Sequence, residues 1–600
     1  MAPATSGLPP ATNASSSQWR EFATLGVACL AFVLTAFYAA PATVYLFNSS
    51  EVTTPLLEVL EVSWVPQVAL ITCVAIFALI GRRRGRQILA AVLLALAALL
   101  YLQGNVLVWD YGKFDGKDID WSRHGLHGVG EALVWLGVLS AAIVSGRRLW
   151  RFVPPAAVAI ILLSGFSLAS HLFSGRTFTP ATASGIDDRF YDFSPKQNTL
   201  IVIMDAFASP AFDLMLANDS SWPERLDGFT FYRDALGVYP TTLPSIPAIM
   251  SGHTTNNSQP VREFLQENMA GEALPTILQE NGFLTHTITE TVYGKYFTDV
   301  PYASTASFLD AVPQNRRLRD ALRIWNVALF RFLPHYLKMR VYSDHRWLLQ
   351  DGNPVGTESR TPFPYSEDEA FRVPSPNQKA TWNLRQQLLD NATADSGKPT
   401  FKFVHFFTTH TPYFLGSDCG QSTQQEYDEL GHEGAVLEQS ACALNQVVEL
   451  LDRLRELKVL DETLVIIAGD HGSHIDLVTG GDRDPKWEGV PALTKVLPTL
   501  LVKPVGASGA LRVSNAPVSL IDIPNTVATE MGLEPVFPGQ ALQDVPADAA
   551  RVRTYYDYTW EHSFWWEDYL PPMTEYRVNG PVRTRESWGE GRVLPSGAGR

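Results

Sequence analysis

Three short apolar runs in the second half of the chain each end in residues that commonly bind metals. One run leads into Asp470 and His471, a second into Asp205, and a third into His410. A carboxylate and an imidazole in adjacent positions can both point at one divalent cation. In open α/β sheets, ligands gather at the carboxyl ends of the strands. If the runs are strands, the residues that follow them predict one metal-assisted active site. The runs cover residues 464–469, 199–204 and 403–407.

A threonine at the start of a predicted helix supplies a candidate nucleophile. Residues 239–252 are typical of a loop entering a helix, in which Pro244 suits the first helical position and Gly252 the helix end. The hydroxyl of Thr242 then lies near the free N–H groups of the helix start. A threonine hydroxyl attacks only when its pKa is lowered, and coordination to a cation has that effect. A purely structural N-cap is the alternative role for Thr242. The metal-binding residues that follow the three runs favour the role of nucleophile for Thr242 over that of N-cap.

Strand and helix patterns alternate through the region that carries these residues. From residue 197 onward, β-branched runs are separated by helical patterns such as 439–457. Strands interleaved with helices indicate a mostly parallel sheet covered on both faces. We therefore predict an α/β domain over residues 197–545, after a linker at 176–196 and before an aromatic-rich extension at 546–600. We expect the extension to pack on the domain rather than rest on a membrane. Further predicted strands cover 283–289 and 497–502.

The first third of the chain is typical of a membrane domain. It holds five apolar stretches, most of which reach the ~17–25 residues that cross a bilayer core. Arginines fill the loops at 82–86 and 147–151, whereas the loop at 47–63 has only acidic charges. Positive-inside counting places the arginine loops in the cytoplasm. This predicts an α-helical five-span domain over 22–175, a cytoplasmic tail at 1–21 and an extracytoplasmic position for the rest. A buried soluble bundle is the alternative. The stretches are 22–46, 64–81, 87–109, 129–145 and 152–173.

Charge and cysteine content narrow the classes of partner. The formal net charge of −15 and the lack of a basic stripe in the soluble part argue against nucleic acid. Cys29 and Cys73 lie in apolar stretches and are expected to be small hydrophobes. Cys419 and Cys442 can form a disulfide if the soluble part is extracytoplasmic. Their spacing does not decide whether they pair.

The candidate nucleophile lies in a motif that resembles the alkaline phosphatase–sulfatase superfamily over roughly 197–530. Sulfatases carry C/S-x-P-S-R followed by TG at this helix start. Here Thr242-Leu243-Pro244-Ser245-Ile246 and Ser251-Gly252 keep the frame. Threonine takes the nucleophile position and isoleucine replaces the arginine. Because no Cys or Ser is present to become formylglycine, the resemblance disfavours sulfatase chemistry.

A threonine nucleophile behind five spans resembles the branch of lipoteichoic acid synthases and of phosphoglycerol and phosphoethanolamine transferases. The resemblance implies one divalent cation, Zn²⁺ or Mn²⁺, with Asp205, Thr242, Asp470 and His471 as its ligands. His410-Thr411-Pro412-Tyr413 matches the HxPY element of the branch. His410 is then expected to contact the substrate phosphate or the leaving group.

Weaker matches concern the substrate pocket and the number of metals. His286 is followed by Tyr293-Gly294-Lys295, where lipoteichoic acid synthases have Trp-x-Arg. The resemblance implies that His286, Tyr293 and Lys295 bind substrate, with the donor headgroup left open. His474 is a second candidate for substrate contact and proton transfer. Leu520 stands where two-metal relatives have a histidine, so one metal is expected.

These observations predict a multi-pass enzyme of the cell (inner) membrane with a periplasmic or extracellular sulfatase-like domain. The expected reaction moves phosphoglycerol or phosphoethanolamine from a membrane phospholipid to an envelope glycan or lipid through a phospho-threonine intermediate. A phosphodiesterase or sulfatase-like hydrolase with the same site is one alternative. A non-catalytic membrane scaffold is the other.

Overall fold

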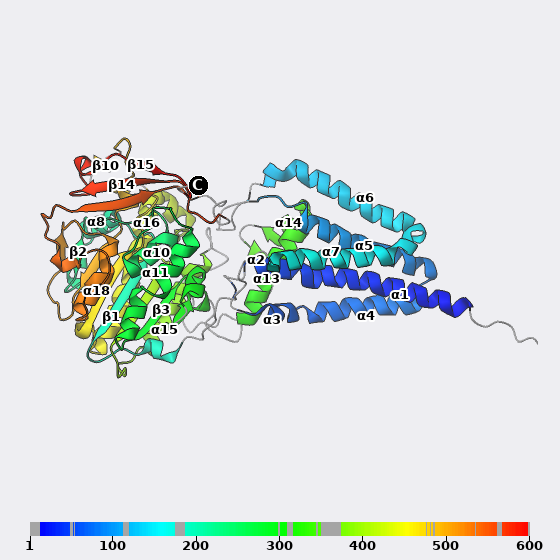
Figure 1. The fold of residues 1–600 in the computed structure, drawn as a ribbon, viewed down its shortest axis with the longest axis horizontal. Coiled ribbons are helices and arrows are strands. Elements are labelled where there is room, and N and C mark those ends of the chain that lie inside the picture. Colours follow the sequence, from blue (N-terminus) through cyan, green and yellow to red (C-terminus); the bar gives the residue numbers. More distant parts are fainter. Residues whose placement is uncertain are drawn as a thin grey trace, which may run out of the picture. The chain divides into compact units, whose positions relative to one another are not determined.

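The computed structural model divides the chain into two compact units, shown as ribbons in Figure 1. One unit comprises Met1–Pro180 and Val312–Gly356, and the other comprises Ala181–Ala311 and Thr357–Arg600. The domain boundaries predicted above remain predictions. The structure describes residues 13–48, 52, 54–111, 119, 121–173, 187–297, 300–308, 316–343, 346–349, 374–475, 477–479, 482–483, 487–534, 536–560 and 567–597.

The first unit is a bundle of apolar helices. Three of its described stretches are long and apolar enough to cross a membrane, namely Gln18–Phe47, Arg83–Asn105 and Trp121–Ser170, and Trp64–Ile80 is a shorter apolar helix. The stretch Trp121–Ser170 contains two long helices joined by a short 3-10 turn. The count of five spans therefore remains a prediction. The helices are α1 (Asn13–Val33), α2 (Ala40–Phe47), α3 (Leu56–Glu61), α4 (Trp64–Ile80), α5 (Arg83–Asn105), α6 (Gly125–Leu149) and α7 (Val153–Phe173).

Two helices from the middle of the sequence also belong to the first unit. They are α13 (Arg316–Phe332) and α14 (His335–Val341), followed by the short strands β5 (Tyr342–Ser343) and β6 (Arg346–Trp347). Apolar residues of α13 pack with Val44, Tyr45 and Val59 of the bundle. Figure 1 shows α13 and α14 at the end of the bundle where α2 ends.

The second unit is built on an eight-stranded sheet with the order β12-β2-β11-β8-β1-β7-β3-β4. The strands pair in parallel except for β11, which is antiparallel to both β8 and β2. The predicted α/β fold with a mostly parallel sheet is confirmed. The strands are β1 (Asn198–Met204), β2 (Thr230–Tyr232), β3 (Leu284–Thr289), β4 (Tyr302–Ser304), β7 (Thr400–Phe406), β8 (Thr463–Gly469), β11 (Leu500–Lys503) and β12 (Arg512–Ser514).

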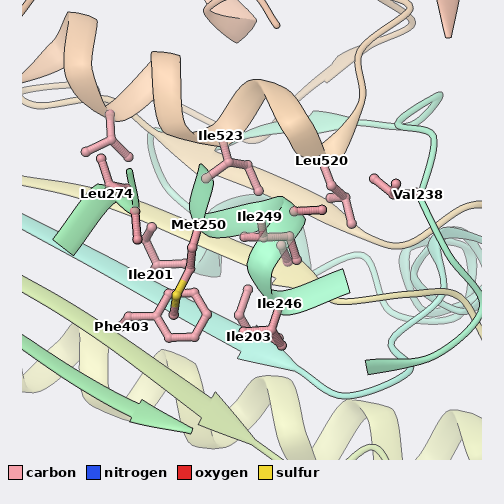
Figure 2. Packing of buried hydrophobic residues seen from close by; sticks show 14 of the residues in the cluster. Ile201, Ile203, Val238, Ile246, Ile249, Met250, Leu274, Phe403, Leu520 and Ile523 are labelled. Carbon is pink, nitrogen blue, oxygen red and sulfur yellow. The ribbon is translucent and has the colours of Figure 1, made fainter. Parts of the chain in front are cut away.

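Strand alternation divides the core between the two faces of the sheet. Ile201 and Ile203 of β1 point to one face, and Leu200, Val202 and Met204 point to the other. Figure 2 shows Ile201, Ile203 and Phe403 beneath Ile246, Ile249 and Met250 of the helix that carries Thr242. The helices of this unit include α8 (Ser209–Asn218), α9 (Trp222–Arg225), α10 (Thr242–Ser251), α11 (Val261–Ala270), α12 (Leu274–Glu280), α15 (Pro376–Asn391), α16 (Gln424–Glu456), α17 (Leu493–Val496) and α18 (Ile523–Glu530).

The aromatic-rich C-terminal extension folds as an antiparallel sheet of β13 (Val552–Asp557), β14 (Met573–Asn579) and β15 (Arg592–Leu594). Tyr555, Tyr576 and Trp588 pack with Leu236 and Val496 of the same unit. The extension therefore packs on the α/β domain, as predicted.

A disulfide joins Cys419 to Cys442 of α16, with their Cα atoms 4.9 Å apart. The spacing of the two cysteines left this pairing open. The bridge fixes the loop after β7 to α16, and that loop carries His410.

Candidate active site

Three adjacent central strands bring the predicted metal-binding residues together. Strand β1 lies between β7 and β8, and Met204 is level with Phe406 and with Gly469. Asp205 and Asp470 therefore leave the sheet side by side. Ala206 adopts a left-handed conformation (φ 58°), and its N–H donates to Oδ1 of Asp470 over 3.0 Å. Strained backbone of this kind costs on the order of 1–3 kcal/mol and is concentrated at functional sites.

A buried cluster of carboxylates and imidazoles stands at this point. Possible ligand atoms of Asp205, His405 and Asp470 all lie within 4.8 Å of one another. Nε2 of His471 lies 3.8 Å from Oδ1 of Asp205 and 3.6 Å from Oδ2 of Asp470. Nε2 of His405 lies 3.7 Å from Oδ2 of Asp205. Two carboxylates and two imidazoles thus converge in a space that can hold a single ion.

The chemistry of this donor set fits a divalent cation. Oδ1 of Asp205, Oδ2 of Asp470 and Nε2 of His405 are buried and have no hydrogen-bond partner among the described residues. Buried polar atoms are normally satisfied, so three orphans on three neighbouring side chains indicate a missing common partner. Mixed carboxylate and imidazole ligands suit Zn²⁺ or Mn²⁺ and do not choose between them.

Electrostatics within the cluster also favour a cation. Burial and the nearby charge of Asp470 raise the pKa of Asp205 well above its ordinary value. Burial also acts to raise the pKa of Asp470, but His471, His405 and the Ala206 N–H together leave that pKa below its ordinary value. Burial lowers the pKa of His405 to about 4. A neutral imidazole beside two close carboxyls is the state that a metal ligand needs.

Both histidines have their other ring nitrogen engaged elsewhere. Nδ1 of His405 lies 3.2 Å from the hydroxyl of Thr289, and Nδ1 of His471 lies 2.6 Å from the carbonyl of Gly472. Such contacts orient a metal-binding histidine and leave Nε2 for the ion.

Thr242 lies at the first position of α10, half-buried beside the cluster. Hydrogen bonding from its hydroxyl acts to lower the pKa of both Asp205 and Asp470. The helix begins at Thr242, two residues before the predicted start at Pro244, and it ends at Gly252 (φ 73°) as predicted. The early start places the hydroxyl within the ring of free N–H groups rather than ahead of it.

Two buried tyrosines form hydrogen bonds around the start of α10. The hydroxyl of Tyr293 donates to the carbonyls of Thr242 (2.9 Å) and Leu243 (3.2 Å). The hydroxyl of Tyr558 lies 2.6 Å from that of Thr241. Tyr293 thus contacts the backbone of the candidate nucleophile, where the resemblance implies substrate contact. Tyr558 belongs to the C-terminal extension and is not singled out by the motifs.

Hydrogen bonds from two buried glutamines fix the backbone of the loop that carries His410. The His410 side chain is exposed, and its carbonyl accepts from Gln378 (2.6 Å) and Gln439 (3.1 Å). Both glutamines are buried. The following peptide, Thr411–Pro412, is cis. His410 can therefore meet a substrate from solvent while its backbone stays fixed.

Of the other predicted substrate contacts, His474 lies next to the site. His474 is exposed, and its ring centroid lies 5.8 Å from that of His471, so it borders the site. The side chain of Lys295 lies outside the described part of the chain.

His286 is not brought to the site. It is level with Lys402 in the register of β3 and β7. Ile288 and Val404, each two residues further along, point to the sheet face away from α10. Alternation places His286 and Lys402 on that same face. His286 packs there against Phe190, with ring centroids 5.8 Å apart.

His405 joins the site although the motifs do not single it out. It lies within β7, level with Ile203, on the face toward α10. The available signal was a lone histidine in an apolar strand that leads to another candidate residue.

Asp522, two residues after Leu520, pairs with Arg551. Both carboxylate oxygens of Asp522 accept from the Arg551 guanidinium, over 2.5 and 2.6 Å. Asp522 is thus a buried ion-pair partner of Arg551.

Comparison with known protein families shows that residues 197–533 match the family model described as Sulfatase. No curated protein sequence matched the chain. The fold is similar to that of the lipoteichoic acid synthase LtaP from Listeria monocytogenes (12% identity, 65% of this chain and 86% of that chain, TM-score 0.36). It is also similar to the C-terminal periplasmic domain of EcEptC from Escherichia coli (11%, 60% and 89%, TM-score 0.34) and to a 2-O GAG sulfatase (13%, 64% and 81%, TM-score 0.39).

Proposed function

Since the chain belongs to the sulfatase family, we propose that it is a membrane-anchored, metal-dependent transferase that uses Thr242 as its nucleophile. The donor is a membrane phospholipid, and the group moved is phosphoglycerol or phosphoethanolamine. The acceptor is a hydroxyl of an envelope glycan or lipid. The apolar helices of the first unit would hold the α/β domain on the outer face of the cell membrane, beside its donor.

One observation carries this proposal. A half-buried threonine at a helix start lies beside two buried carboxylates, and each carboxylate keeps an oxygen with no hydrogen-bond partner among the described residues. The residues that would hold a cation are Asp205, His405, Asp470 and His471, with Thr242 at the open side. A bound divalent cation would lower the pKa of the threonine hydroxyl and stabilise charge on the phosphoryl group.

The chain's own residues supply the remaining steps. Thr242 releases its hydroxyl proton to solvent and its oxygen forms a bond to phosphorus, while the bond between phosphorus and the diacylglycerol oxygen breaks. Diacylglycerol leaves with a proton, and we assign the exposed His410 as its donor. In the second half, an acceptor hydroxyl attacks phosphorus and its proton goes to the same histidine. The bond between phosphorus and Thr242 breaks, and the threonine oxygen regains its proton from solvent. Tyr293 holds the nucleophile's backbone throughout.

A hydrolase is the second candidate function. His410 and His474 are both exposed, so water can reach the same phosphoryl group. With water as acceptor, the products are diacylglycerol and the free substituted phosphate.

Mass spectrometry of the Thr242 peptide after incubation with labelled phospholipid vesicles tests the proposal. We expect an added phosphoglycerol or phosphoethanolamine on Thr242, which disappears when an acceptor is supplied. Thr242→Ala should lose the adduct and all turnover, while Thr529→Ala, at an exposed threonine of α18, should keep both.

The distribution of label separates the alternatives. Label that appears only as free substituted phosphate identifies the hydrolase. A wild-type chain with neither adduct nor turnover, in the presence of Zn²⁺ or Mn²⁺, identifies a scaffold and refutes both enzymatic readings.

A further inference from the structure

The segment Val312–Gly356 joins the helical unit although the chain on both sides of it belongs to the α/β unit. Its first helix, α13, is amphipathic and lays its apolar side on α2 and α3. The amide and hydroxyl of Thr54 both donate to the buried Asp320 of α13, over 3.1 and 2.8 Å. Arg317 forms an ion pair with Glu61 of α3. These contacts make the segment an integral part of the bundle.

The second helix of the segment, α14, is fixed to the start of α6 by a buried carboxylate. Oε2 of Glu131 accepts from the backbone N–H of His335 over 2.6 Å. Oε1 of the same residue accepts from the indole of Trp109 over 2.5 Å. The hydroxyl of Tyr111 lies 2.8 Å from Nδ1 of His335. These hydrogen bonds fix the start of α14 to the bundle.

The contacts of the segment place it at one particular end of the bundle. Nε of Arg331 donates to the carbonyl of Gly104 over 2.9 Å, near the last turn of α5. The arginine-rich loop lies at the other end of α5, about 32 Å away at ~1.5 Å per residue. That separation matches a hydrocarbon core about 30 Å thick. If the arginine loops are cytoplasmic, α14 lies at the level of the outer headgroups.

The exposed side of α14 is apolar. Tyr336, Leu337 and Met339 are 49%, 47% and 38% exposed, while Lys338 between them is turned inward. Arg340 is exposed beside them. Rings of Tyr111, Trp121 and Trp347 gather in the adjoining core around Phe330, as expected of an interfacial aromatic belt.

We propose that α14 is an interfacial anchor whose Tyr336–Leu337–Met339 edge lies among the outer-leaflet lipids. Apolar side chains enter the boundary between headgroups and acyl chains, and Arg340 meets the lipid phosphates. The occupant is the bilayer because α14 is bonded to α6, a candidate membrane-spanning helix whose Leu126 and Leu133 are also exposed. The inference rests on the membrane placement proposed above and not on the reaction.

Depth-dependent fluorescence quenching tests this proposal with the full-length chain. Leu337→Cys in a Cys73→Ser background is labelled with an environment-sensitive dye and reconstituted into phosphatidylethanolamine–phosphatidylglycerol vesicles. Val513→Cys on β12 is the matched control, since it is 56% exposed on the α/β unit. Met339→Cys repeats the test if the first variant does not assemble.

We expect lipids with a nitroxide near the headgroup to quench the dye at 337 several-fold more than the dye at 513. Aqueous iodide should show the opposite order. Equal behaviour of the two positions refutes the anchor. Protection of position 337 from both quenchers also refutes it, because that result shows a protein surface covering α14. Neither outcome depends on catalytic turnover, so the transferase proposal stands or falls separately.

Discussion

Replacement of Asp470 by asparagine should have opposite effects on the metal-free and the metal-loaded protein. Asp205 and Asp470 have ligand atoms within 4.8 Å of each other, and each keeps a buried oxygen with no partner among the described residues. At an effective dielectric constant of about 20, two charges at this distance repel by about 3–4 kcal/mol. Asparagine removes the repulsion, and its amide oxygen can still accept from the N–H of Ala206.

The expected size of the effect follows from these contacts. Part of the gain is offset, because Asp470 also loses its attraction to His471. We expect the metal-free variant to be about 1–3 kcal/mol more stable than the metal-free wild type. The loss of a ligand should at the same time remove most of the stabilisation by Zn²⁺ or Mn²⁺, which follows mass action in the wild type.

Thermal unfolding of the solubilised full-length chain, after chelation and again with added cation, measures both effects. Asp522→Asn is the control, because it breaks a buried pair with Arg551. That variant should lose about 3–5 kcal/mol and keep the wild-type response to metal. The reasoning is wrong if metal-free Asp470→Asn unfolds at a lower temperature than the metal-free wild type. It is also wrong if added cation stabilises the variant as much as it stabilises the wild type.

Three other changes have defined outcomes. Tyr293→Phe removes hydrogen bonds to the backbone of Thr242 and should lower kcat about tenfold with little change in KM, as steady-state kinetics would show; an unchanged kcat contradicts a positioning role. Burial lowers the pKa of Lys402 from 10.5 to about 7, so between these values the unfolded chain binds more protons and stability rises with pH. Lys402→Met should stabilise the protein by about 2–4 kcal/mol near pH 7, and denaturant titrations should then show a smaller rise of the unfolding free energy with pH. If the rise persists in this variant, another group causes it. Cys442→Ser should cost about 3 kcal/mol and make the unfolding midpoint insensitive to dithiothreitol; a midpoint that still falls on reduction contradicts this.

The α/β architecture could be predicted because its signals are local. The apolar runs that became β1, β7 and β8 are bounded by polar residues, and each is long enough for a buried strand. The expectation that ligands gather at strand ends brought Asp205 and Asp470 together, and the pairing of β1 with β8 in the structure places them side by side. The helix stop at Gly252 was also readable, since a left-handed position favours glycine.

The rest of the site depends on pairing register, which composition does not reveal. His405 and His286 are both histidines in buried strands, yet alternation turns the first toward α10 and the second away. The sequence also does not reveal that residues 312–356 belong to the helical unit, for a related reason. The partners of α13 and α14 lie more than two hundred residues earlier, so local patterning shows an amphipathic helix without naming the surface it covers.

The contact between Thr241 and Tyr558 spans 317 positions of the chain. During synthesis, Thr241 thus lacks this contact until nearly the whole polypeptide has emerged. An interrupted product ending before this tyrosine would carry every candidate metal ligand but an unbraced helix start. The completed surroundings of Thr242 in this way depend on the folding of the C-terminal sheet.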